Sequence, residues 1–156
     1  MSDVLAVRPG DRAPDFTLQA SSGEEITLSV HHGTSNVLLA FFPLAFTPVC
    51  TSELCAFSDD FSQFAGAETV IYGISVDAAP SLKAFRATHN ISVELLSDFR
   101  REVCRAYGTL LEPEFFSRRA YVIVDRDGIV RWTFVERELG HRRQNAELLA
   151  QIEALA

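Results

Sequence analysis

The hydrophobic and polar positions of this chain follow the patterns of strands first and then of alternating helices and strands. Two short alternating segments, Asp15–Leu18 and Glu25–Leu28, flank the turn-forming Ser21–Gly23 and predict a β-hairpin. No polar residue interrupts Val37–Phe42, which indicates a strand buried on both faces of a central parallel sheet. The chain is therefore expected to begin with a hairpin and continue into a buried strand.

The rest of the pattern alternates between helices and strands. A helix is expected over Pro48–Phe64, because Leu54, Phe57, Phe61 and Phe64 form an apolar stripe at three- and four-residue spacing. Further strands are expected at Thr69–Val76, Val93–Leu96, Ala120–Val124 and Ile129–Val135, and further helices at Pro80–Thr88, Arg101–Tyr107 and Arg143–Leu155. This order predicts an α/β protein with the thioredoxin fold, an N-terminal β-hairpin extension and a mixed central sheet flanked by helices.

Length, net charge and the length of apolar runs exclude several classes of protein. A length of 156 residues with 47 % hydrophobic content fits a single domain over residues 1–156 with a full core. A net charge of −7, with no cluster of Lys and Arg larger than a pair, argues against nucleic acid as a partner. The apolar run Val37–Phe42 is too short to span a membrane, and Met1–Asp11 lacks the pattern of a signal peptide. We therefore expect a cytoplasmic protein.

Three cysteines in a cytoplasmic chain are more often reactive, metal-bound or buried than paired in structural disulfides. Cys50 lies just inside the start of the helix that is expected after the buried strand. Thr47 is a good N-cap and Pro48 suits the first helical position, so Cys50 falls at the third. Backbone N–H groups there lack helical partners, and the local field favours a thiolate. These residues alone leave two interpretations of Cys50, a reactive thiol or an inert buried one.

The spacing of Pro43, Thr47 and Cys50 resembles the peroxiredoxin motif, and the resemblance extends over nearly the whole chain. Its other matches are Glu53, the opening Ala13–Phe16, and Arg119, which stands where the family places its active-site arginine, with Arg118 as the alternative. The sequence of Phe42–Thr47 is similar to that of the AhpE-like branch of the family. The spacing of Cys50 and Cys55 instead resembles the bacterioferritin-comigratory, or PrxQ, branch.

The resemblance implies a thiol-dependent peroxidase that reduces hydrogen peroxide and organic hydroperoxides. Cys50 would attack the peroxide and become a sulfenic acid. Arg119 would favour the thiolate and stabilise charge on the leaving oxygen. Thr47 and the backbone N–H of Cys50 would bind the peroxide oxygens, Pro43 would shield the sulfenate from water, and Glu53 would orient the arginine. Phe42 and Phe46 are expected to wall the substrate pocket.

The role of Cys55 depends on helix geometry. Five residues along a helix separate two Cα atoms by about 8–9 Å on different faces, beyond the roughly 7 Å limit for a disulfide. A bond between Cys50 and Cys55 therefore requires the first helical turns to unwind. The PrxQ-like resemblance implies that Cys55 resolves the sulfenic acid, the alternative being a buried bystander. Cys104 is expected in the core, with a lesser possibility that it resolves Cys50.

Other function classes compete with the peroxidase. A thioredoxin-like disulfide reductase would need a Cys-x-x-Cys pair, which the chain lacks, and a redox-inactive interaction module has no such requirement. A structural zinc site needs ligands beyond one cysteine pair, and the scattered histidines supply none, so no metal is expected; a thiol peroxidase also needs no bound cofactor. The expected partners are peroxides and a reductant that is thioredoxin, a glutaredoxin-like protein or a low-molecular-weight thiol. A one-cysteine cycle with an external thiol and a homodimer both stay open.

Overall fold

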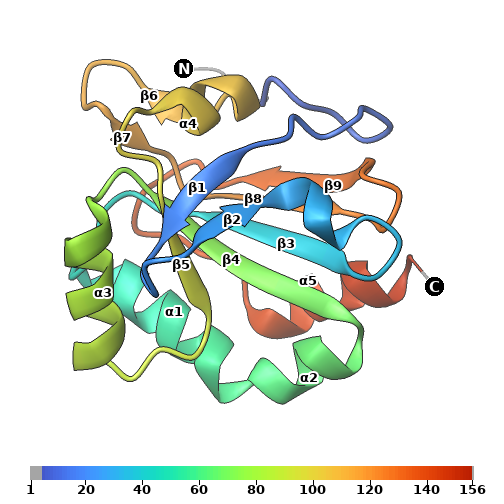
Figure 1. Ribbon diagram of the computed structural model, residues 1–156, viewed down its shortest axis with the longest axis horizontal. Coiled ribbons are helices and arrows are strands. Elements are labelled where there is room, and N and C mark those ends of the chain that lie inside the picture. Colours follow the sequence, from blue (N-terminus) through green and yellow to red (C-terminus); the bar gives the residue numbers. More distant parts are fainter. Residues whose placement is uncertain (1–4, 156) are drawn as a thin grey trace.

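The computed structural model describes residues 5–155, which are built around one mixed β-sheet. Its parallel centre consists of β3 (Asn36–Phe41), β4 (Thr69–Ser75) and β5 (Glu94–Ser97). The antiparallel strands are β1 (Thr17–Ala20), β2 (Glu25–Thr27), β8 (Ala120–Val124) and β9 (Val130–Val135). The strand order is β2-β1-β5-β4-β3-β8-β9, so the N-terminal hairpin extends one side of the sheet and the C-terminal hairpin the other (Figure 1).

Helices cover both faces of this sheet. Four of them lie on one face: α1 (Pro48–Asp59), α2 (Phe61–Gly66), α3 (Ala79–Thr88) and α5 (Asn145–Glu153) (Figure 1). The short α4 (Glu102–Tyr107) lies on the other face, followed by a small hairpin of β6 (Leu110–Leu111) and β7 (Phe116–Ser117). A 3₁₀ turn, η1 (Leu28–His31), follows β2. The expected mixed sheet flanked by helices, with its N-terminal hairpin, is confirmed.

Strand alternation divides the interior into two clusters, because successive side chains of a strand point to opposite faces. In β3, Leu38 and Ala40 pack with α1, α2, α3 and α5, whereas Val37 and Leu39 pack with α4. In β8, Tyr121 belongs to the α1 side. Arg119, two residues before Tyr121, shares that parity, so the chain geometry directs it toward the same face as α1.

The helix predicted over Pro48–Phe64 is divided in the structure. α1 ends at Asp59 and α2 begins at Phe61, with Asp60 between them at φ −105°. The Asn145 side-chain amide donates to the Ala56 carbonyl at 2.8 Å and to the Asp60 carboxylate at 2.8 Å. This contact, made by a residue 85 positions away in the sequence from Asp60, caps α1 before the apolar stripe ends.

Other boundaries also differ from the prediction. The first strand begins at Thr17 rather than Asp15, whose carboxylate instead accepts the Ser29 N–H at 3.0 Å. α5 begins at Asn145 rather than Arg143, whose backbone N–H donates to the Tyr121 hydroxyl at 2.9 Å. The β6–β7 hairpin is absent from the sequence prediction. No helix within residues 5–155 has the length and apolar character needed to cross a bilayer, and residues 1–4 of the Met1–Asp11 segment lie outside the described residues.

Candidate active site

The loop between β3 and α1 lies at the carboxyl end of the parallel strands, where α/β sheets place their ligands. Pro43 is buried two residues after the end of β3. The Ala45 N–H donates to the Asp77 carboxylate at 2.9 Å, and Asp77 also accepts the Ser75 hydroxyl at 2.7 Å. Phe46 has a left-handed backbone with φ +66°, which is uncommon for a residue with a side chain. The end of β4 thus holds this loop in a strained shape before α1.

Cys50 is the third residue of α1 and has no exposed surface. Arg119 precedes β8 and is also buried, with its guanidinium reaching the sulfur. Arg119 Nη2 donates to Cys50 Sγ at 3.1 Å and to the Leu139 carbonyl at 3.2 Å. Arg119 is therefore the arginine that contacts the cysteine, and the segment after β9 contributes an acceptor to the same group.

A buried carboxylate fixes this arginine. Glu53, one turn after Cys50 in α1, accepts a hydrogen bond from Arg119 Nη1 at 2.9 Å. Its other oxygen accepts a hydrogen bond from the Tyr121 hydroxyl. Glu53 and Tyr121 are both fully buried, so these bonds replace the hydration that the groups lose on folding.

Burial and charge act on these groups in opposite directions. Burial raises the pKa of the Glu53 carboxyl above its usual value, although Arg119 and Tyr121 each act to lower it. Burial by itself lowers the pKa of the Arg119 guanidinium, but Glu53 and Cys50 outweigh that effect and raise it. Burial and the Glu53 charge raise the pKa of Tyr121, so its hydroxyl keeps the proton that it donates. A permanent positive charge therefore lies against the Cys50 sulfur.

Thr47, Phe46 and Phe42 match their expected roles only in part. Thr47 stands at the expected N-cap position with an extended backbone, but its hydroxyl donates to the Leu44 carbonyl at 2.8 Å instead of capping the helix or contacting the sulfur. Phe46 is 51 % exposed, with its ring 5.0 Å from that of Phe85. Phe42 is fully buried and packs in the core, so it supports the wall behind Phe85 without facing solvent.

The three cysteines are separate in this structure, and all are free thiols. Cys55 is partly buried on α1, and its thiol makes a long contact of 4.0 Å with the His89 carbonyl. Cys104 is fully buried on α4, on the opposite side of the sheet, as expected for a core residue. No cluster of three or more His, Cys, Asp or Glu side chains suited to a metal forms within residues 5–155.

Comparison with known proteins agrees with this geometry. Residues 9–133 match the AhpC/TSA family. The chain is also 36 % identical over 149 residues to alkyl hydroperoxide reductase E of Mycobacterium tuberculosis, an alignment that covers 93 % of this chain and 97 % of the relative. The chain belongs to the peroxiredoxins. As a peroxiredoxin it is a thiol-dependent peroxidase, and the peroxiredoxin resemblance found in the sequence is confirmed.

Solved structures support the same fold for this peroxiredoxin. Reduced 2-Cys peroxiredoxin from Plasmodium vivax superposes with a TM-score of 0.87 and 31 % identity, covering 99 % of this chain and 82 % of that one. Peroxidoxin BcpB from Mycobacterium tuberculosis superposes with a TM-score of 0.85 and 28 % identity, covering 96 % and 98 %. The thioredoxin-like α/β fold is therefore confirmed, and peroxides and thiols are the reactants of the family.

Sequence reasoning missed two parts of this peroxiredoxin's site. Tyr121 completes the Glu53–Arg119 pair. Its position in β8, two residues after Arg119, was a usable signal, because side chains two residues apart in extended backbone share a face. The Leu139 backbone carbonyl accepts a hydrogen bond from Arg119. A backbone contact of this kind leaves no residue motif in the sequence from which it could be predicted.

Proposed function

We propose that Cys50 is the residue of this peroxidase that the peroxide substrate oxidises. The observation that carries the proposal is the Arg119 guanidinium, which lies 3.1 Å from Cys50 Sγ while Glu53 holds its other end at 2.9 Å. The Cys50 thiolate attacks the terminal oxygen of a hydroperoxide, forming an S–O bond as the O–O bond breaks. The thiolate becomes a sulfenic acid, and the leaving alkoxide or hydroxide takes up a proton to give an alcohol or water.

The neighbouring residues serve this step through charge and shape. Arg119 stabilises the thiolate and the negative charge that develops on the leaving oxygen. Thr47 and the Cys50 backbone N–H bind the peroxide oxygens at the start of α1. Pro43 limits water at the sulfenate. The exposed ring of Phe46, with Phe42 behind it, gives an apolar wall that suits organic hydroperoxides as well as hydrogen peroxide.

We propose that Cys55 then resolves the sulfenic acid. Its thiol displaces water from Cys50–SOH, so an S–S bond forms as the S–O bond breaks. Both cysteines lie on α1 on different faces, and the first turns of α1 must unwind to bring them together. The partial exposure of Cys55 and its long contact with His89 favour such a movement. The alternative is a one-cysteine cycle in which an external thiol attacks Cys50.

Residues 1–156 would form one domain that acts in the cytoplasm. Thiols are kept reduced there, which fits the three free cysteines. The disulfide would be reduced by thioredoxin, a glutaredoxin-like protein or a low-molecular-weight thiol, at the expense of two thiol groups on the reductant. A homodimer would be compatible with this cycle, and the reaction requires no bound cofactor.

The first test is the intact mass of the reduced protein after one equivalent of hydrogen peroxide, with peptide mapping. Loss of two hydrogens that map to Cys50 and Cys55 is the expected result. Gain of one oxygen on Cys50 with Cys55 free would support the one-cysteine cycle instead. No rapid change at Cys50 would exclude Cys50 as the reacting group.

Circular dichroism of the same samples checks the conformational step. Formation of the Cys50–Cys55 bond should lower the helical signal, because α1 loses its first turns. A disulfide at these residues with no loss of helix would contradict the unwinding, and a Cys55→Ser sample treated in the same way should keep its helical signal.

A further inference from the structure

Tyr121 joins the cysteine site to the loop that follows β9. Two hydrogen bonds connect this loop, Glu136–Gln144, to the site. Both involve side chains at the start of β8. Arg119 Nη2 donates to the Leu139 carbonyl at 3.2 Å, and the Arg143 backbone N–H donates to the Tyr121 hydroxyl at 2.9 Å. The same Tyr121 hydroxyl donates to Glu53. One buried oxygen is therefore both an acceptor for the loop and a donor to the carboxylate that holds Arg119.

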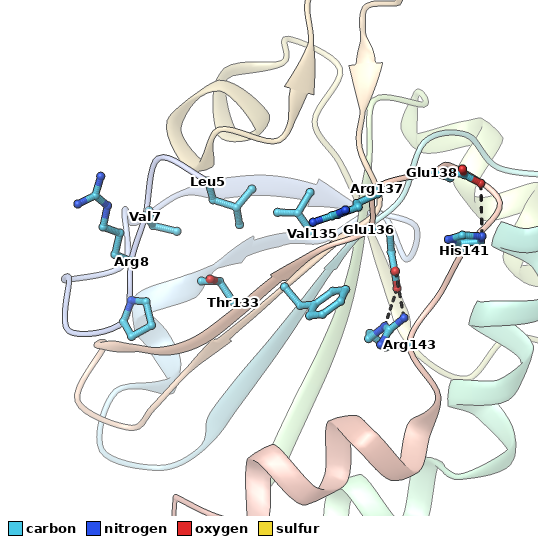
Figure 2. A pocket seen from close by; sticks show the side chains of 12 residues that line it. Leu5, Val7, Arg8, Thr133, Val135, Glu136, Arg137, Glu138, His141 and Arg143 are labelled. Carbon is cyan, nitrogen blue, oxygen red and sulfur yellow. Dashed lines mark hydrogen bonds and ion pairs between the residues drawn. The ribbon is translucent and has the colours of Figure 1, made fainter. Parts of the chain in front are cut away.

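The outer side of the Glu136–Gln144 loop is also anchored. Arg143 pairs with the buried Glu136 at 2.9 Å and lies over the Phe134 ring at 4.3 Å. Figure 2 shows Glu136 and Arg143 at the wall of a pocket of about 700 Å³ beside β9, with Glu138 directed toward His141. The Arg143 side chain thus fixes its own backbone N–H in the position from which Tyr121 accepts it.

We infer that Tyr121 is a positioning residue of the peroxidase, which aligns Arg119 with the Cys50 sulfur through Glu53. Glu53 has two oxygens, and Arg119 occupies one of them. Within residues 5–155, the donor to the second oxygen is the Tyr121 hydroxyl, so without it the carboxylate can rotate and take the guanidinium with it. Since Cys50 is closed to solvent, the alignment of Arg119 is set by these buried contacts and not by water. Displacements of this kind lower reaction rates steeply.

The inference rests on the assignment of Cys50 and Arg119 under the proposed function. The test compares two reactions of reduced Cys50 in wild type and Tyr121→Phe. Both reactions consume the thiolate, so each rate is compared at a pH where it no longer rises with pH. Reaction with hydrogen peroxide then still needs Arg119 to stabilise the leaving oxygen, whereas alkylation by iodoacetamide releases iodide and does not. Each rate is followed by mass spectrometry with fragmentation to assign the modified cysteine.

Tyr121→Phe is expected to slow oxidation by hydrogen peroxide about 10-fold or more, while alkylation changes by less than about 3-fold. A matched control is Tyr107→Phe. Tyr107 is equally buried and its hydroxyl donates to the Pro14 carbonyl at 2.7 Å, on the other side of the sheet. This variant should leave both rates within about 3-fold of wild type.

The route through Glu53 is checked by a double-mutant cycle. In a Glu53→Gln background, Tyr121→Phe should add less than about 3-fold to the loss, because the two residues act through one contact. An unchanged peroxide rate in Tyr121→Phe would overturn the inference, as would an equal fall in both rates. Persistence of peroxide oxidation in Cys50→Ser would instead refute the proposed function, so the two failures can be distinguished.

Discussion

Cys50 and Cys104 occupy equivalent positions in two helices but have opposite electrostatic surroundings. Each is the third residue of its helix, α1 or α4, and each is fully buried. Cys50 contacts the Arg119 guanidinium. Cys104 lies beside the buried Asp98, whose carboxylate accepts its backbone N–H at 2.7 Å. Burial and then the Asp98 charge raise the pKa of the Cys104 thiol far above its usual value.

The comparison shows that a place in the first turn of a helix does not by itself make a thiol reactive. At α4 the first-turn N–H groups that lack helical partners are already used, since Asp98 also accepts the Val103 N–H at 3.2 Å. The positive end of that helix is neutralised by a carboxylate and cannot stabilise a thiolate. At α1 the acidic residue, Glu53, is paired with Arg119. The same guanidinium donates to the Cys50 sulfur, so the charge beside this thiol is positive. We therefore expect neighbouring charge to decide which of the two thiols reacts.

Replacing each of these cysteines by serine gives the largest expected contrast. Cys50→Ser should lower hydrogen peroxide consumption by more than about 10³-fold, because the nucleophile is lost. Cys104→Ser should stay within about 3-fold of wild type, since Cys104 has a carboxylate beside it where Cys50 has a cation. Peroxide consumption with dithiothreitol as reductant is the measurement. Comparable losses in the two variants would contradict the assignment of distinct roles.

The part of the site that the sequence predicts is the part carried by local spacing. Pro43, Thr47 and Cys50 lie within one strand–loop–helix unit, and the apolar run before them and the proline at the first helical position are visible in the sequence. Arg119 lies far from them in sequence and could be placed only through the family resemblance. The alternation of β8 then explains its direction, since Tyr121 on the same strand face also reaches Glu53.

The features that escaped prediction depend on contacts between distant segments. Asn145 ends α1 by donating to the Ala56 carbonyl, and no property of residues 48–64 indicates this. The Thr47 hydroxyl donates to the Leu44 carbonyl because the loop is held in a strained shape by Asp77. Backbone groups such as the Leu139 carbonyl carry no side-chain signature at all. Local patterns thus predict elements, and tertiary contacts adjust their ends.

Asp98→Asn tests the charge on the Cys104 side. Asp98 is 1 % exposed and accepts two backbone N–H groups, so the free energy of unfolding should fall by about 1–3 kcal/mol, measured in urea. The pKa of Cys104 should fall but stay raised, because burial is the larger of its causes. Cys104 is therefore expected to resist iodoacetamide in the folded variant, and peroxide consumption should stay within about 3-fold of wild type.

Asp11→Asn is the matched control for this variant. Asp11 is exposed and accepts the Arg8 N–H at 2.9 Å, so its replacement should change the free energy of unfolding by about 0.5 kcal/mol. Rapid alkylation of Cys104 in folded Asp98→Asn would show that charge alone, and not burial, protects that thiol.

The smallest expected effect concerns pH on the Cys104 side of the sheet, where His31 Nε2 lies 2.6 Å from the Tyr72 hydroxyl. Burial raises the pKa of Tyr72 to about 12, so the hydroxyl stays protonated and donates to a neutral His31. Burial, and then the charge of His32, lower the pKa of His31 in the folded chain. The unfolded chain consequently binds the proton first, and stability is lost as the pH falls from about 6.5 through the folded value.

His31→Phe should keep the ring contact and remove the titration. At pH 7.5 the variant should be less stable than wild type by about 1 kcal/mol, the usual worth of one hydrogen bond. Urea unfolding at pH 7.5 and at pH 5 should show this difference narrowing, because the lowered pKa of folded His31 makes wild type lose stability as the pH falls, whereas the variant has no such loss. His141→Gln, which removes an exposed histidine, is the control. A stability difference that is constant with pH would mean that His31 does not titrate in this range, and the bond between His31 and Tyr72 would then give the Cys104 side no sensitivity to pH.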